Sequence, residues 1–215
     1  MLSAKSITSL VFLSAALSLT RTPSVAPVVQ EAPARELTAF GDLSAHPGQA
    51  LGQRVEFSVT FHRWVETWDP YLTRFGQEDY ACFEGWSDEQ YPWRESDFDF
   101  PAVRVFFKRD SEALRSIRDA KTWNRFTVEA TVHQYFAGMP WLEVLGVEEE
   151  RAALNEGCVI HATRALDEMS KEQFEIAVQE LDRALVGVLP LKAKGELLRL
   201  KGQAIALQRS SEETN

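Results

Sequence analysis

Apolar and polar residues alternate in several stretches of the middle of the chain. The alternation is clearest over 54–64, where the apolar positions are Val55, Phe57, Val59 and Phe61. This pattern is typical of a β-strand with one buried face. The second strand is predicted across 72–75 and 80–86. Three more strands are predicted over 101–108, 126–133 and 141–147.

One helix is predicted inside this strand-rich region. Asp110 or Ser111 can cap its first turn, and the helix is expected to end near Ala120. Glu112 lies near its start, whereas the basic residues lie toward its end, which suits the helix dipole. The order of elements is therefore three strands, a helix and two strands joined by a hairpin.

After residue 150 the hydrophobic period changes to that of helices. Helices are predicted over 154–169, 174–189 and 191–206, and Pro190 separates the last two. The second has one apolar face, formed by Phe174, Ala177, Leu181, Ala184 and Leu185. The fold class is therefore α+β, with a β-rich domain over 35–150 and a helical region over 151–215.

The first 34 residues have the composition of a targeting segment. Lys5 precedes an apolar run over 7–19, and a stretch rich in Pro, Ala and Val follows over 21–34. A bilayer needs about 20 apolar residues to be spanned, so this run is too short. We interpret 1–34 as a signal peptide and flexible linker, with an uncleaved anchor or a plain tail as alternatives. The mature protein is then expected to be periplasmic or extracellular, without a transmembrane domain.

The net charge of −9 is concentrated in the predicted β-rich domain. Residues 35–150 hold 12 Lys and Arg against 21 Asp and Glu, a charge of −9, whereas residues 151–215 hold 9 against 10. Nucleic-acid binding depends on cations that neutralise phosphates. The charge therefore argues against a nucleic-acid partner.

Two resemblances to known families follow from these elements. The order of elements from Gly52 to Val147 resembles an OB-fold domain, as in small exported bacterial proteins of that kind. That resemblance implies a five-stranded barrel with a helix between strands three and four, and a ligand face on strands two and three. The stretch from Ala165 to Pro190 resembles one tetratricopeptide repeat at Phe174, Ala177 and Leu181, although the Trp and Gly of its first helix are missing.

Aromatic residues gather between the first and third predicted strands. We select as candidate ligand contacts the aromatic residues and one arginine of this region: Trp64, Trp68, Tyr71, Arg74, Tyr91 and Trp93. Exposed rings could stack on bases or sugars. The alternative is that these rings fill the barrel and pack its loops.

The chemistry-bearing residues form no recognisable catalytic motif. The sequence contains no HExxH, nucleophile elbow or phosphate-binding glycine loop, and we assign no catalytic residue, metal ligand or cofactor. Cys82 and Cys158 could form a disulfide in an oxidising compartment, or be two separate buried thiols.

Three function classes remain open. The first is a non-enzymatic exported protein that recognises a protein or envelope ligand through loop aromatics. The second is an OB-type binder of single-stranded nucleic acid, by analogy of fold. The third is a hydrolase that uses loop carboxylates.

Overall fold

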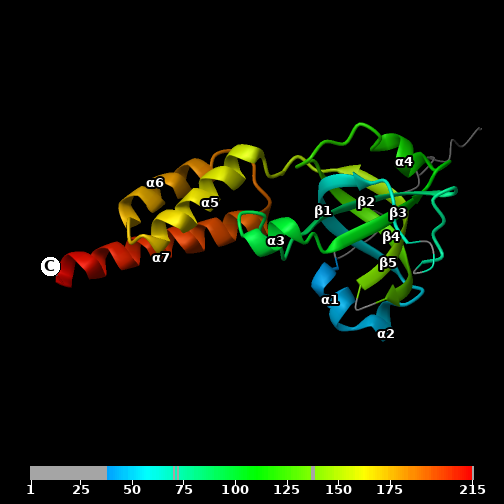
Figure 1. Cartoon of the computed structure of the whole chain (residues 1–215), viewed down its shortest axis with the longest axis horizontal. Helices are drawn as coiled ribbons and strands as arrows, with labels where there is room; N and C mark the ends of the chain where they lie inside the picture. The colour runs from blue at the N-terminus through cyan, green and yellow to red at the C-terminus, as the bar shows by residue number, and fades with distance from the viewer. Residues whose placement is uncertain (1–37, 70, 72, 137–138, 215) are drawn as a thin grey trace, which may run out of the picture. The chain divides into compact units, whose positions relative to one another are not determined.

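The computed structural model describes residues 38–69, 71, 73–136 and 139–214 (Figure 1). The predicted signal peptide and linker, 1–34, lie outside the described residues. The chain begins with two short helices, α1 (Phe40–Ala45) and α2 (Pro47–Ala50). Five strands follow: β1 (Arg54–Val65), β2 (Tyr80–Ser87), β3 (Val103–Lys108), β4 (Arg125–Phe136) and β5 (Met139–Glu149).

The five strands form one closed barrel in the order β1-β2-β3-β5-β4, with β1 and β4 paired to complete it. Strands β3 and β5 pair in parallel, with Val105 opposite Leu142, and the other pairs are antiparallel. The short helix α4 (Glu112–Ser116) lies between β3 and β4. The prediction of an α+β chain with a five-stranded barrel and C-terminal helices is confirmed.

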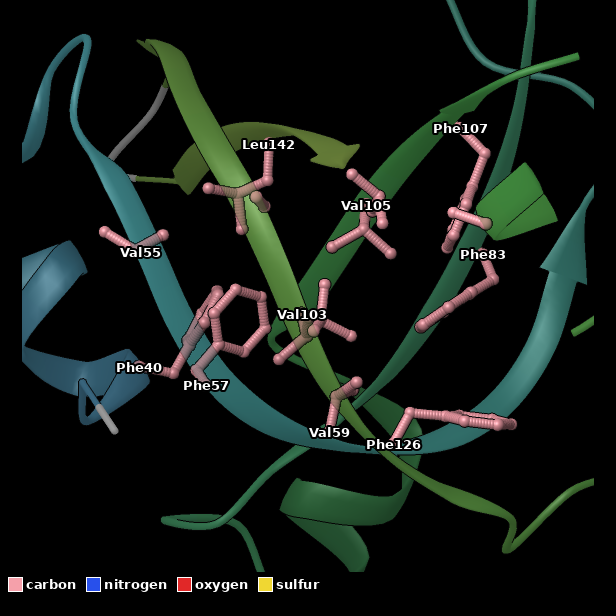
Figure 2. Close-up of a cluster of buried hydrophobic side chains, with 14 of the residues drawn as sticks. Phe40, Val55, Phe57, Val59, Phe83, Val103, Val105, Phe107, Phe126 and Leu142 are labelled. Atoms are coloured by element: carbon pink, nitrogen blue, oxygen red, sulfur yellow. The ribbon is translucent and has the colours of Figure 1, made fainter. Parts of the chain in front are cut away.

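The alternating residues of β1 fill the barrel interior. Figure 2 shows Phe57, Val59 and other labelled side chains converging from several strands on a shared core. Phe40 of α1 packs on Phe57 with ring centroids 5.4 Å apart, so the lead-in helix covers one side of that core. A glycine is required at Gly85, because a Cβ atom there would lie 2.4 Å from the backbone oxygen of Thr60.

Three helices follow the barrel: α5 (Glu156–Ser170), α6 (Phe174–Ala184) and α7 (Leu191–Thr214). Helix α6 packs against both α5 and α7 (Figure 1). Small residues on their facing sides, among them Ala162, Ala165, Ala177 and Ala184, are completely buried. Side chains of this size allow the helices to approach closely. Among the described residues, no helix is long and apolar enough to cross a bilayer.

Several boundaries differ from those predicted. Helix α4 ends at Ser116, because Ile117 leaves helical geometry and is buried in the barrel core. Helix α6 ends at Ala184, before Gly187, whose φ of 109° is not helical. Helix α7 continues to Thr214, well beyond the predicted end near 206. Between β2 and β3, where no element was predicted, the chain forms the short helix α3 (Glu95–Asp99).

Candidate ligand-binding groove

The aromatic residues of the β1–β2 connection pack against the barrel. Trp68 is buried, and its indole N–H donates to the carbonyl oxygen of Phe75 at 2.6 Å. Phe75 stacks on Phe106 of β3, and Phe106 stacks on Trp141 of β5, with centroids 4.4 and 5.1 Å apart. Because these rings cover one another, Trp68 presents little surface to a ligand.

The other predicted contacts before β2 differ in their surroundings. Trp64 is half-buried against the barrel core, where its ring meets Phe61 edge-on at 5.5 Å. Tyr71 is 94% exposed, and its backbone N–H donates to Asp69. Arg74 is exposed, and its charge acts on Tyr80. Tyr71 and Arg74 are therefore open to solvent, whereas Trp64 packs on the core.

Tyr91 and Trp93 lie in the β2–β3 connection, which packs on the C-terminal helices. Their rings stack at 5.2 Å, and the Arg94 guanidinium lies 4.8 Å from the Tyr91 ring centre. Trp93 is 2% exposed and belongs to the helical core with Leu154 and Val159. Trp93 therefore joins the barrel connection to the helices.

Ion pairs hold the first half of this connection. Asp88 pairs with the buried Arg125 of β4. Glu89 pairs with Lys192 of α7 at 2.6 Å, and Arg94 pairs with Glu196 on the same helix. These pairs tie residues 88–94 to β4 and to α7.

A groove of about 520 Å³ opens between this segment and α5. The β2–β3 connection contributes Pro92, Trp93, Glu95 and Phe98, and α5 contributes Val159, Ile160, Thr163 and Arg164. The groove is lined mainly by apolar atoms. Phe98 and Ile160 are each 40% exposed, so the groove presents apolar surface to an incoming ligand.

Polar groups of the groove have unused bonding capacity. Glu95 and Arg164 are exposed, and neither forms an ion pair within the described ranges. The buried indole N–H of Trp93 finds no acceptor in the part of the chain that the structure describes. The Thr163 hydroxyl, in contrast, donates to the carbonyl oxygen of Val159 at 2.9 Å. The groove therefore combines an apolar lining with one exposed cation and one exposed anion.

Sequence reasoning selected Trp93 from this groove but missed Phe98 and the α5 residues. The sequence contained one signal for the α5 residues, which is the position of each side chain around the helix. Its buried positions include Cys158, Val159 and Ala162, and Ile160 falls outside that face. An isoleucine outside the buried face of a helix is a candidate contact residue, although single exposed apolar residues are common.

Two other polar clusters lie on the barrel. The buried carboxylate of Glu143 meets the Lys108 ammonium and the His133 Nε2 atom, each at 2.9 Å. Burial, followed by the charge of Glu143, raises the pKa of Tyr80 beside them. The buried Glu84 pairs with Arg63 at 2.6 Å.

A third network surrounds the last residue of the barrel region. Glu150 accepts hydrogen bonds from Ser58, Arg125 and Thr127. Burial alone would raise the pKa of this carboxyl group, but these hydrogen bonds and the Arg125 charge outweigh it and lower the pKa. The Ser58 hydroxyl of this network also lines a small hollow of about 170 Å³ beside α1. Among the described residues, no group of three or more His, Cys, Asp or Glu side chains could hold a metal ion.

The two cysteines are free and lie in different clusters. Cys82 packs with Trp68 and Phe106 on the barrel, whereas Cys158 belongs to the helical core. Burial raises the pKa of Cys82 to about 12 and that of Cys158 to about 11. This arrangement corresponds to the alternative of two separate buried thiols.

No protein-family model matches the sequence, and no curated protein matches it. The role of the groove is therefore argued from its geometry and chemistry alone.

Proposed function

We propose that this chain is a non-enzymatic exported binding protein, with an OB-type barrel and a tetratricopeptide-like helical hairpin. It recognises a protein or envelope ligand through aromatic side chains of the β2–β3 connection. Support for the OB-type barrel comes from the strand order, the parallel β3–β5 pairing and the position of α4 between β3 and β4. Support for the repeat-like hairpin comes from the complete burial of Ala165, Ala177, Leu181 and Ala184.

The observation that carries the proposal is the apolar groove beside Phe98 and Ile160. Its volume of about 520 Å³ falls in the usual range for ligand sites, roughly 300–1,000 Å³. Such sites are mostly apolar with a few polar groups that fix orientation. The groove has this composition, with Arg164 and Glu95 as its charged groups.

The barrel surface supports such a ligand better than a single-stranded nucleic acid. Arg63 of β1 and Arg104 of β3 both pair with the buried Glu84, which lies between them on β2. The rings of Phe75 and Phe106 stack on each other rather than standing free for bases. With these cations and rings engaged within the chain, the acidic barrel is poorly suited to bind phosphates and bases.

A pull-down from an envelope extract of the producing cells tests the proposal. The full chain is compared with Phe98→Ser and Ile160→Ser, which make the groove polar. The matched controls are Phe100→Ser, 75% exposed, and Ile176→Ser, 45% exposed, neither of which lines the groove. We expect the captured ligand to be lost with the two groove variants and retained with the two controls. Capture that is equal for all five proteins would refute the proposal.

A further inference from the structure

We infer that the groove between 92–98 and α5 binds an apolar chain that ends in a single carboxylate, as in a medium-chain fatty acid. This inference rests on the proposed function, because it names the ligand class of the same site.

The chemistry of the groove changes along α5. Val159 and Ile160 lie one turn before Thr163 and Arg164, and residues four apart share a helix face. The groove is therefore apolar at one end of this wall and polar at the other. A ligand that matches this gradient has an apolar body and a polar end.

The charge at the polar end favours an anion. The Arg164 guanidinium is exposed and forms no ion pair among the described residues, although its charge contributes to the lowered pKa of Glu180 on α6. Its planar donors match a carboxylate in two parallel hydrogen bonds. The indole N–H of Trp93 is buried and is therefore not open to a ligand in the groove. A ligand that ends in a carboxylate supplies the acceptor oxygens that the Arg164 donors lack.

The charge of that anion is limited by Glu95. This carboxylate also lines the groove and has no ion pair in the described part of the chain, so the groove is close to neutral overall. A polyanion such as a phosphate ester would gain from Arg164 but be repelled by Glu95. A monoanion with a long apolar part suits the groove better.

Isothermal titration of the full chain tests the inference with decanoate as the probe. Decanol has the same chain without the charge, acetate has the charge without the chain, and decyl phosphate carries more charge. We expect saturable binding of one decanoate, at least tenfold weaker binding of decanol and of decyl phosphate, and no binding of acetate. Decanol or decyl phosphate binding as tightly as decanoate would overturn the inference.

Variants locate the site. Arg164→Gln is expected to weaken decanoate binding about tenfold or more. Arg164→Lys is expected to retain part of the affinity, and Glu95→Gln to increase it. The control Arg209→Gln, which changes an exposed arginine of α7 that does not line the groove, is expected to have no effect. Equal affinities for Arg164→Gln and Arg209→Gln would overturn the inference.

The two proposals can fail separately. If the extract yields a ligand that depends on Phe98 and Ile160 but decanoate does not bind, the carboxylate inference is wrong and the binding function stands. If decanoate binds through Arg164 but capture from the extract is insensitive to both groove residues, the proposed recognition function is wrong.

Discussion

Two buried tryptophans provide a controlled test of the unsatisfied donor in the groove. Trp93 is 2% exposed and its indole N–H has no acceptor among the described residues, whereas Trp86 is 1% exposed and donates to the carbonyl oxygen of Asp97 at 2.9 Å. Replacing each with Phe removes the N–H group and about the same apolar surface. The difference between the two variants therefore isolates the hydrogen bond.

The expected free energies follow from these contacts. Each substitution loses about two buried carbons, or ~1.6 kcal/mol at ~0.8 kcal/mol per carbon. Trp93→Phe also removes a buried unsatisfied donor, which relieves about 1–3 kcal/mol, so the net change lies near zero. Trp86→Phe instead loses a hydrogen bond with a net value of about 1 kcal/mol, which brings its cost to ~2.6 kcal/mol.

Urea unfolding followed by circular dichroism measures both changes, provided that the slope with denaturant stays constant. We expect Trp86→Phe to cost about 3 kcal/mol more than Trp93→Phe. Equal costs would refute the reasoning, because they would mean that the Trp93 N–H has an acceptor in solution.

Three further predictions concern the barrel and the thiols. Gly85→Ala should destabilise the protein by about 1–3 kcal/mol or more in urea unfolding, because its Cβ would lie 2.4 Å from a backbone oxygen of β1. The control Gly146→Ala meets nothing closer than 3.9 Å and should cost less than about 1 kcal/mol. Equal costs for the two variants would contradict the close approach at Gly85. The lowered pKa of Glu150 stabilises the fold above the unfolded carboxyl pKa of about 4.3, and this stabilisation is lost as pH falls through the folded value. Glu150→Gln should therefore reduce the loss of stability on acidification, measured as Tm between pH 3 and 6, and an unchanged pH profile would argue against the network. Cys82 and Cys158, with pKa values of about 12 and 11, should resist alkylation at pH 8 in the folded protein. After urea is added, both thiols should react, and the intact mass of the protein measures this. If neither reacts in urea without reductant, the two cysteines form a disulfide.

The barrel could be predicted because its strands alternate strongly. In β1 the residues Val55, Phe57, Val59 and Phe61 are all buried, as period-two alternation requires. The ends of the helices were harder to predict from the sequence, because they depend on tertiary contacts. Helix α4 stops at Ser116, where Ile117 enters the barrel core, and no local sequence signal marks that point.

The candidate site was harder to predict than the fold. Aromatic content alone does not distinguish Trp68, which packs on the barrel, from Trp93, which lines a groove. That groove needs α5 beside the β2–β3 connection, and residues 93 and 163 are far apart in the chain. Phe98 and Ile160 line the same groove only in the folded chain, so the sequence pattern could not predict that they lie close together.

Site-specific photo-crosslinking shows whether the groove contacts a ligand. A photoreactive phenylalanine analogue is placed at Phe98 or, as the control, at the more exposed Phe100 of the same connection. After irradiation in envelope extract, we expect a defined added mass on the protein labelled at 98 and none on the protein labelled at 100. An equal yield at both positions, or adducts at 100 alone, would contradict the assignment of the groove as the recognition site.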